Sequence, residues 1–539
     1  MRIDLSVQSK HWRFMALAAT IVATGAIVST YSVFNNMYDE PAHIAAGMEW
    51  LSRGTYTLDP QHPPLSRVAS ALLPWLSGER STGDTRMFSE GRAILGRGEH
   101  YVRTLALARL GQVPFFLVLA FVTWYWTRRL ASERAAAFAV GFVVTNPNIL
   151  AHAGVAGTDI GPAALMPAAL LTWTLWLDRP DAKRSVAFGL ALALCGLTKF
   201  SAGAYWVPAA IAVALFHAMQ RHDTTLWAGL RRRFRPSVIA FMTACVVTWA
   251  MYRFDVGPVG RFTVPAPEFW TGLAEFFRRG ARGHPSFLLG EVRSSGWWYS
   301  DLVTMLVKTP IPLLLFSAVG SWVAVAEVRQ LRRAAATKDP QQPDWRFTML
   351  AAPVIGVTSV LLVASATPVD LGVRLALPMH PMLAILAALG LSAALARAKQ
   401  MVPRAGLALI GTWAVAVPMV AHPDHIAYFN AIAGRDPSRI LVESNLDWGQ
   451  DLFRLRDAMK ELRMDSLRVH YFGTAEFRAV GLERAWRLAP DERTTGWVAA
   501  SETFYAGVWS DTSLAWLHAF EPVRRVGKSM RLYYIKPAP

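Results

Sequence analysis

The segment from Arg13 to His43, RFMALAATIVATGAIVSTYSVFNNMYDEPAH, decides the class of the fold. Its first part is an apolar run long enough to cross the hydrocarbon core of a bilayer as a helix, which takes roughly twenty residues. Two carboxylates, Asp39 and Glu40, follow this run and precede Pro41, a residue that suits the first turn of a helix. Carboxylates at the mouth of a membrane helix are costly to desolvate, so the pattern indicates a membrane protein with a functional acidic site.

The composition of the whole chain agrees with a membrane protein. Of its 539 residues, 53% are hydrophobic and 17% are charged, whereas soluble domains carry about 25% charged residues. The formal net charge of +17 could indicate nucleic-acid binding, but the arginines cluster between the apolar runs. Topology signals and anionic lipid headgroups explain that placement. We therefore expect membrane lipids, and no nucleic acid, among the partners.

Apolar runs of similar length recur along the chain and predict about eleven membrane helices. The runs cover residues 13–34, 107–127, 135–152, 161–177, 186–199, 201–219, 237–253, 302–325, 347–365, 375–396 and 405–421. The stretch 186–219 is the least regular of them, because it could instead form one re-entrant pair.

The placement of lysine and arginine predicts which side of the membrane each loop faces. Basic clusters precede the first run and recur in alternate loops, namely Arg2, Lys10, Arg13, Arg128, Arg129, Lys183, Arg184, Arg231, Arg232, Arg233, Arg332, Arg333, Arg397 and Lys399. With these clusters inside, the N-terminus is cytoplasmic. Loops 35–105, 153–160, 254–300 and 366–374 then face outward, together with the tail from residue 422. We expect a multi-pass protein of the cell inner (plasma) membrane.

Two outward regions are too long to be simple connectors. Loop 35–105 mixes Trp and Leu with scattered arginines, which predicts helices lying along the membrane interface. The tail changes to a polar α/β pattern, strand-like at 439–443, 467–472, 496–500 and 530–535 and helix-like at 450–462. We predict a transmembrane module over residues 1–421 and a soluble extracytoplasmic α/β domain over residues 422–539.

Acidic residues at the outward helix ends are the first candidates for a site. Asp39 lies one helical turn before His43 and could act as a general base toward a hydroxyl or amine. It could also hold a divalent cation with His43 or His62, or simply cap a helix. Asp159 precedes the run 161–177 and is either an N-cap or a second carboxylate facing the same cavity. One histidine with carboxylates is no metal signature, so no metal ligand is assigned and a divalent cation is left open.

Basic residues at the outward ends pose a similar choice. Lys199, Lys308 and Arg374 could each anchor a helix at the interface. Each could equally neutralise a lipid phosphate, which needs a cation at headgroup depth. Three basic residues and two acidic sites on one face favour a phosphate-bearing substrate with a charged reaction centre.

An ordered set of short motifs resembles the membrane glycosyltransferases of superfamily C, in particular bacterial members of family 39, which are related to protein O-mannosyltransferases and lipid A aminoarabinose transferases. The motifs are YDEPAH (38–43), HPPL (62–65), Asp159, LTK (197–199), Gly290 with GWWY (296–299) and KTP (308–310), GVRLALP (372–378), AYFN (427–430) and SNLDWGQ (444–450). Each motif is weak alone, but the ordered set spans nearly the whole chain.

The resemblance implies a polytopic helical fold of the superfamily C type and an activity. A sugar would pass from a polyprenyl-phosphate carrier to a glycan, lipid or protein acceptor at the outer membrane face. In such families the acid of the first outer loop activates the acceptor, which carries over onto Asp39. Glu40 would support it, and Asp159 would orient acceptor or donor. The remaining residues of the expected substrate site are Lys199 and Arg374 on the lipid phosphate, with His43, His62 and Lys308.

One position departs from the pattern of the aminoarabinose transferases, which usually carry a lysine where this chain has His62. His62 can replace a phosphate-binding lysine only when it is protonated; otherwise it has another role, such as metal ligation. Segment 444–450 could pack the tail against the membrane part or select the acceptor.

Two other functions compete with sugar transfer. A flippase or transporter of lipid-linked glycans predicts half-chain repeats and charges near helix centres, and the sequence has no convincing repeat. An oligosaccharide ligase would share the lipid-phosphate donor and the cavity.

Overall fold

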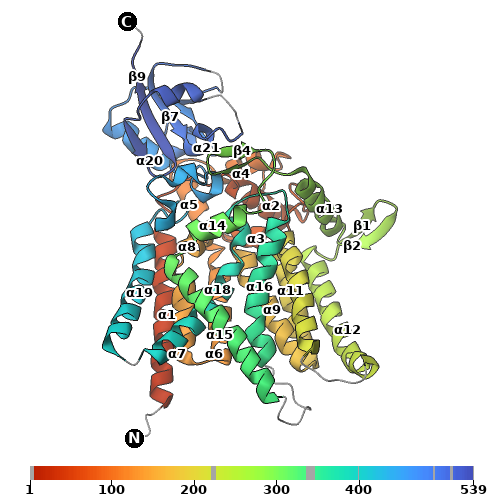
Figure 1. Cartoon of the computed structure of the whole chain (residues 1–539). Coiled ribbons are helices and arrows are strands. Elements are labelled where there is room, and N and C mark those ends of the chain that lie inside the picture. Colours follow the sequence, from red (N-terminus) through yellow and green to blue (C-terminus); the bar gives the residue numbers. More distant parts are fainter. Residues whose placement is uncertain are drawn as a thin grey trace.

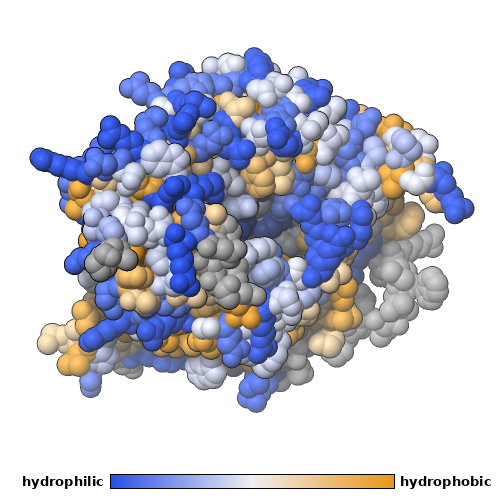
Figure 2. Space-filling model, turned by 90° about the horizontal axis from the view of Figure 1, so that it is seen from above, coloured by the Kyte–Doolittle hydropathy of each residue, from blue (hydrophilic) through white to orange (hydrophobic). Residues whose placement is uncertain are grey.

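The chain forms a bundle of long helices with a small sheet region above one end (Figure 1). The computed structural model describes residues 5–219, 226–335, 346–398, 400–489, 492–509 and 514–537. The N-terminus lies at the lower end of the bundle in Figure 1, and the C-terminus lies at the top, beyond the sheet. Seen from above, hydrophilic residues cover most of the upper end, and hydrophobic residues gather toward its rim (Figure 2).

The helices of the bundle are α1 (Leu5–Ser29), α6 (Val113–Leu130), α7 (Glu133–Val144), α8 (Pro147–Ala153), α9 (Ile160–Asp178), α10 (Ala182–Thr198), α11 (Phe200–Met219), α12 (Leu226–Met251), α15 (Ile311–Ala335), α16 (Arg346–Ser365), α18 (Met379–Arg397) and α19 (Met401–Ala421). Nine helices within the described residues are long and apolar enough to cross a membrane, and the pair α7 and α8, bent by 65°, could be a tenth. Helix α10 has 17 residues, short of the roughly twenty that a span needs. The polytopic helical class is thus confirmed, while the count of eleven spans stays a prediction.

Ion pairs and a hydrogen bond tie several predicted cytoplasmic clusters to neighbouring helix ends. Glu133, at the start of α7, accepts hydrogen bonds from Arg13 over 2.7 Å and pairs with Arg128 over 2.5 Å. Arg233 donates to the carbonyl of Leu177, at the end of α9. Arg2 and Lys399, and the side chains of Arg231, Arg232 and Arg332, lie outside the described residues. Which side of the membrane these helix ends face stays a prediction.

Four helices fill the segment predicted as the first outward loop: α2 (Glu40–Arg53), α3 (Pro64–Leu76), α4 (Met87–Leu95) and α5 (Gly98–Leu110). Two glycines let α2 pack backbone to backbone between α3 and α4. A Cβ on Gly47 would lie 2.1 Å from the carbonyl oxygen of Arg67, and one on Gly91 would lie 2.0 Å from that of Pro41. Helix α2 is therefore enclosed by protein rather than lying along the interface.

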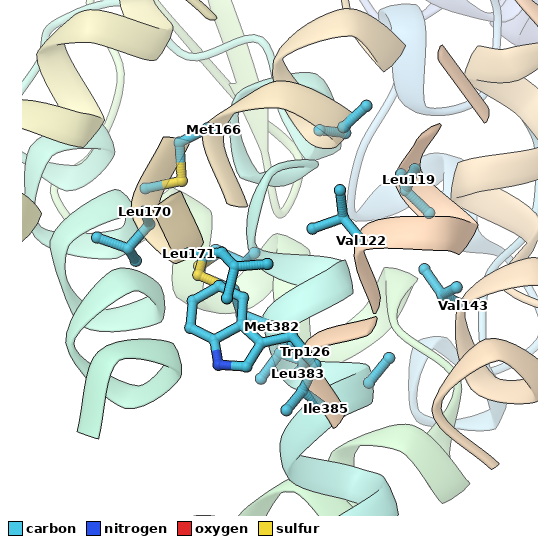
Figure 3. Close-up of a cluster of buried hydrophobic side chains, with 14 of the residues drawn as sticks. Leu119, Val122, Trp126, Val143, Met166, Leu170, Leu171, Met382, Leu383 and Ile385 are labelled. Carbon is cyan, nitrogen blue, oxygen red and sulfur yellow. The ribbon is translucent and has the colours of Figure 1, made fainter. Parts of the chain in front are cut away.

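The core of the bundle forms where α6, α7, α9 and α18 meet (Figure 3). Trp126 is fully buried there, packed among the side chains drawn in Figure 3, and its Nε1 donates to the carbonyl of Met349 over 3.3 Å. This contact ties the last turn of α6 to the first turn of α16.

The remaining upper elements are short. They are β1 (Val256–Val259), β2 (Phe262–Pro265), α13 (Pro267–Arg282), β3 (Ser286–Leu288), β4 (Glu291–Arg293), α14 (Ser300–Lys308) and α17 (Val373–Ala376). The tail adds α20 (Leu452–Glu461), β5 (Leu467–His470), β6 (Ala485–Arg487), β7 (Gly496–Ser501), α21 (Glu502–Tyr505), β8 (Arg524–Val526) and β9 (Met530–Ile535).

The tail carries a five-stranded sheet in the order β6-β5-β7-β9-β8. Strand β5 pairs in parallel with β6 and β7, while β9 runs antiparallel to β7 and β8. Three of the four predicted strands and the predicted helix are confirmed. The strand predicted over 439–443 is wrong, because this segment is irregular between two short 3-10 turns. Its backbone bonds elsewhere: the carbonyl of Ile440 accepts from Leu289, and the N–H of Glu443 donates to the hydroxyl of Thr503.

One hydrophobic core crosses the predicted boundary between membrane module and tail. Ile44 of α2 and Leu105 of α5 share a buried cluster with Leu452, Val469 and Leu532 of the tail. The sheet region is therefore seated on the helices of the first outward loop, and this contact brings the start of the tail to the charged helix ends.

Candidate active site

Arg374 of α17 bridges two carboxylates that are far apart in the sequence. Its Nε donates to Asp159 Oδ2 over 2.9 Å, and its Nη2 donates to Asp39 Oδ2 over 3.0 Å. Lys199 adds a second cation, donating from Nζ to Asp159 Oδ1 over 2.7 Å. Four of the residues that the sequence singled out thus form one cluster of alternating charge.

Helix ends place these side chains. Asp39 and Asp159 occupy the N-cap positions of α2 and α9, but neither side chain caps its helix. Each carboxylate points to a cation instead, so the capping interpretation does not account for either residue. Lys199 lies at the break between α10 and α11 in an extended conformation. A Cβ on Gly161 would lie 2.8 Å from Thr198, and this close packing brings Asp159 beside Lys199.

The two carboxylates differ in their access to solvent. The side chain of Asp39 is 30% exposed, whereas that of Asp159 is 2% exposed. Burial alone would raise the pKa of Asp159, but Arg374 and Lys199 outweigh it and hold that pKa well below its ordinary value. Asp159 is therefore a fixed anion that holds two cations, and Asp39 is the carboxylate that a substrate can reach.

The tail covers Arg374 with an aromatic ring. The guanidinium carbon of Arg374 lies 4.2 Å from the ring centroid of Trp448, a distance typical of cation–π contact. The ring of Trp448 also contacts that of His152, with centroids 5.8 Å apart, and His152 Nδ1 lies 3.5 Å from Asp159. From the sequence, Trp448 has a role only as part of segment 444–450 and His152 has none, because nothing local to either residue shows that the cluster lies beside it.

Segment 444–450 is fixed to the membrane part by its side chains and by one tight glycine contact. The amide of Asn445 accepts from the N–H of Val373 over 3.0 Å. Gly372 has a φ of 63°, and a Cβ there would lie 2.1 Å from the Asn445 side chain, so only glycine fits. Asp447 accepts from the N–H of Thr503 over 3.0 Å. These contacts hold Trp448 over Arg374.

Glu40 lies next to Asp39 in sequence but in a closed environment. It is fully buried and pairs with Arg109, whose Nε and Nη2 donate over 2.9 and 2.8 Å. The N–H groups of Met37 and Ala156 donate to it over 2.7 Å each. Glu40 thereby ties the loop before α2 to the loop before Asp159, and within the described residues its side chain forms no hydrogen bond or ion pair with the cluster.

Lys308, expected in the substrate site, is held elsewhere. Its side chain is fully buried, and its Nζ donates to the carbonyls of Ile426 and Asn445 over 2.7 Å each. The ammonium also lies 4.4 Å from the ring centroid of Phe429. Lys308 fastens the start of the tail to α14 and is not part of the charged cluster.

His43 and His62 pack edge to face beside the cluster, with ring centroids 5.7 Å apart. Arg67 donates from Nε to His43 Nδ1 over 3.2 Å and pairs with Asp59. Burial, with the nearby charge of Arg67, holds the pKa of both histidines well below the ordinary value. His62 is therefore neutral near pH 7 and supplies no positive charge. Among the described residues, no group of three or more His, Cys, Asp and Glu is placed to hold a metal ion.

Glu443 adds a further carboxyl that sequence reasoning missed. It lies at a φ of 53°, in the left-handed region that side chains rarely adopt. Burial raises its pKa to about 8, Arg374 opposes the shift, and Asp39 adds to it. The strained backbone thus presents a protonated carboxyl to the cluster near neutral pH.

No protein-family model and no curated protein sequence matches the chain, but solved structures do. The Archaeoglobus fulgidus oligosaccharyltransferase in complex with Zn and sulfate superposes with a TM-score of 0.54 at 12% identity, covering 93% of this chain and 70% of that one. The same enzyme tethered with an acceptor peptide gives 0.51 at 12% identity, covering 94% and 72%. ArnT from Cupriavidus metallidurans bound to undecaprenyl phosphate gives 0.49 at 14% identity, covering 96% and 97%.

The chain has the fold of the superfamily C membrane glycosyltransferases. The resemblance drawn from the ordered motifs is confirmed at the level of the fold. At these identities the superfamily C likeness assigns no role to any residue, so the roles rest on the geometry of the cluster.

Proposed function

We propose that the protein transfers a sugar from a polyprenyl-phosphate carrier to an acceptor at the outer face of the cell inner membrane, with Asp39 as the base. The observation that carries the proposal is the bridge of Arg374 between Asp39 and Asp159, completed by Lys199. In this bridge the accessible carboxylate of Asp39 contacts Arg374, and Arg374 shares Asp159 with the second cation, Lys199. The superfamily C fold supports the same reaction class.

The proposed step is a direct displacement. Asp39 accepts the proton of an acceptor hydroxyl or amine while that atom attacks the anomeric carbon. The bond from this carbon to the phosphate oxygen breaks, and the electron pair leaves with the polyprenyl phosphate. Attack from the opposite side inverts the configuration of the anomeric carbon. The proton passes from Asp39 to solvent, which its 30% exposed side chain permits.

Arg374 and Lys199 are proposed to stabilise the leaving phosphate. Nε and Nη2 of Arg374 are bound to the two aspartates, and its Nη1 makes no hydrogen bond within the described residues. Nη1 carries two N–H donors, which can bind a phosphate oxygen without breaking the bridge. Fixed cations aimed at the developing charge supply much of the rate in such reactions.

The buried residues are proposed to position this machinery. Asp159 holds both cations, and Glu40 fixes the loop that carries Asp39. His43 and His62 lie beside the cluster with Nε2 and Nδ1, respectively, lacking a partner within the described residues, and a neutral imidazole can hydrogen-bond a sugar hydroxyl. Lys308 is not proposed to bind substrate, because both backbone carbonyls that it contacts belong to the tail.

The test compares full-length wild-type protein with Asp39→Asn in detergent. Radiolabelled polyprenyl-phosphate sugars serve as donors and a membrane extract as acceptor, with and without a chelator. We expect transfer to fall by roughly 10²–10⁴-fold while the protein keeps its thermal stability. Asp84→Asn is the matched control, because Asp84 lies in the same outward loop, is 26% exposed and pairs with an arginine, yet lies outside the cluster.

Full transfer by folded Asp39→Asn would refute the assignment of the base. Movement of lipid-linked glycan across vesicles, with no transfer from any donor, would favour the flippase interpretation instead.

A further inference from the structure

An apolar groove of about 900 Å³ lies between α1, α7, α18 and α19. Figure 1 shows α1 and α19 next to each other at one side of the bundle. Among the residues of α19, all of which the structure describes, Val417 alone is buried. The helix therefore stands off from the bundle and forms an outer wall of the groove.

The groove is about as long as the bilayer core is thick. Along α1 its lining extends from Trp12 to Ser29, which at 1.5 Å per residue is roughly 26 Å, against a hydrocarbon core of about 30 Å. A groove of this length between membrane-length helices matches an extended lipid chain.

Small residues keep the groove open. Gly25, Gly141 and Gly411 line it from α1, α7 and α19, and a Cβ built on any of them would meet nothing within 4 Å. Small residues in membrane helices usually bring backbones into contact. Here they widen a space that helix packing leaves unfilled, so the space accommodates something other than a helix.

A chain of hydrogen bonds at the upper end of the groove determines which ring nitrogen of His425 carries the proton. The hydroxyl of Ser29 donates to the carbonyl of Ala26 over 2.8 Å, so its oxygen accepts from His422 Nε2, 3.5 Å away. His422 Nδ1 is then a bare acceptor, and His425 Nε2 donates to it over 3.4 Å. This network assigns the remaining nitrogen, Nδ1 of His425, as an acceptor without a proton.

That acceptor has no partner in the part of the chain that the structure describes. His425 is 3% exposed, and its Nδ1 is buried without a hydrogen bond. Burial, with His422 adding to it, lowers the pKa of His425 to about 4, so the ring is neutral near pH 7. A buried acceptor left unpaired costs about 1–3 kcal/mol, and a ligand with an O–H or N–H group would remove that cost.

We propose that the groove binds an acyl-chain membrane lipid whose headgroup donates a hydrogen bond to Nδ1 of His425. The hydrocarbon lies against the small residues of α1, α7 and α19. The headgroup lies at the upper end, beside Ser29 and His422. This site is lined by other residues than the charged cluster, and its occupancy does not depend on the proposed sugar transfer.

The test measures lipid retention by full-length protein in detergent, using native mass spectrometry. The probes are phosphatidylglycerol, phosphatidylethanolamine and phosphatidylcholine with identical acyl chains. The first two headgroups carry O–H or N–H donors, and choline carries none. We expect the wild type to retain the first two lipids roughly two- to tenfold more than phosphatidylcholine, the range of one net hydrogen bond.

Two variants separate the headgroup contact from the chain contact. His425→Phe keeps a ring of similar size, removes Nδ1 and should abolish the preference between headgroups. Gly411→Leu should fill the groove and lower the retention of all three lipids several-fold. Gly406→Leu is the matched control, because a Cβ on Gly406 also meets nothing within 4 Å but this residue of the same helix does not line the groove.

Equal retention of the three lipids by the wild type would overturn the headgroup contact, and unchanged retention by Gly411→Leu would overturn the groove. Displacement of phosphatidylglycerol by polyprenyl phosphate in the wild type, but not in Gly411→Leu, would assign the groove to an isoprenoid chain and also overturn the proposal. None of these lipid-retention measurements requires transfer activity. Their outcome is therefore independent of whether the proposed sugar transfer is correct.

Discussion

Two ion pairs lie next to each other at the start of α2 and differ in almost every respect. The pair of Glu40 with Arg109 has side-chain exposures of 0% and 1%, and two backbone N–H groups complete the shell of Glu40. The pair of Asp39 with Arg374 has exposures of 30% and 9%. Neighbouring carboxylates can thus have separate tasks, since one braces two loops and the other is open to reactants.

The same contrast separates two lysines. The ammonium of Lys308 donates to two backbone carbonyls. Lys199 instead pairs with the carboxylate of Asp159, which also binds Arg374. A buried cation bound to neutral carbonyls fixes the chain, while Nη1 of Arg374 makes no hydrogen bond within the described residues and can bind an anion. The predictions below test this division, from the largest expected effect to the smallest.

Replacing Glu40 should affect stability most. Glu40→Gln leaves Arg109 buried without its counter-charge, and breaking such a pair costs about 3–5 kcal/mol. We expect a large fall in the thermal midpoint in detergent, and little folded protein at 37 °C.

The double variant Glu40→Gln with Arg109→Met is the control, because it removes both charges and should regain part of the lost stability. A Glu40→Gln protein with wild-type stability and lost transfer would reverse the comparison, since it would make Glu40 the reactive partner.

Arg374→Lys tests the open cluster. Lysine cannot reach both aspartates with a rigid fork, so kcat/KM for the donor should fall by about ten- to a hundredfold, the size of one or two charge-assisted hydrogen bonds. The measurement is initial transfer rate against donor concentration.

Arg454→Lys is its matched control, because Arg454 also contacts two carboxylates, Asp424 and Asp451, and lies over the ring of Phe34. Equal losses in both variants would indicate a general packing effect rather than a role in the site.

Replacing Lys308 and Lys199 one at a time should distinguish a residue that stabilises the fold from one that binds the donor. Lys308→Met leaves the carbonyls of Ile426 and Asn445 unpaired, so the free energy of unfolding should fall by about 1–3 kcal/mol, with an unchanged donor KM in the protein that folds. Lys199→Met should raise the donor KM. Unfolding curves and donor titrations of both variants test these two roles. A raised donor KM in Lys308→Met would contradict the assignment of Lys308 to stability alone.

The pH dependence should reveal Glu443. Its pKa of about 8 means that the carboxyl is neutral below this pH and charged above it. A negative charge beside Arg374 then competes with the donor phosphate, so the donor KM of the wild type should rise roughly two- to fivefold as the pH passes through 8. Glu443→Gln should remove this rise, and Glu461→Gln, at an exposed ion pair with Arg524, should keep it. A wild-type profile that persists in Glu443→Gln would exclude this carboxyl as its source.

The sequence predicted what local pattern encodes. Hydropathy predicted the polytopic helical class, and the strand-like pattern located β5, β7 and β9, while the count of eleven spans stays a prediction. The wrong strand at 439–443 shows the limit, because buried Leu441 and Val442 read alike in a strand and in an irregular packed segment.

The sequence predicted the four members of the charged cluster but not which of the other charged residues lie outside it. Asp39, Asp159, Lys199 and Arg374 stood out as charges at helix ends and do lie together. Lys308 looked the same in sequence, yet its partners come from a segment more than a hundred residues later in the chain. Burial and long-range partners decide such roles, and no local pattern records them.

The contact of Trp448 with Arg374 also has a consequence for biosynthesis. Every helix of the bundle precedes Trp448 in the chain, so the ring reaches Arg374 only after the last of them has been inserted and the tail has followed. A nascent or truncated chain would carry all four charged residues and lack the cover that holds the guanidinium in place. Assembly of the site therefore depends on synthesis of the tail segment that carries Trp448.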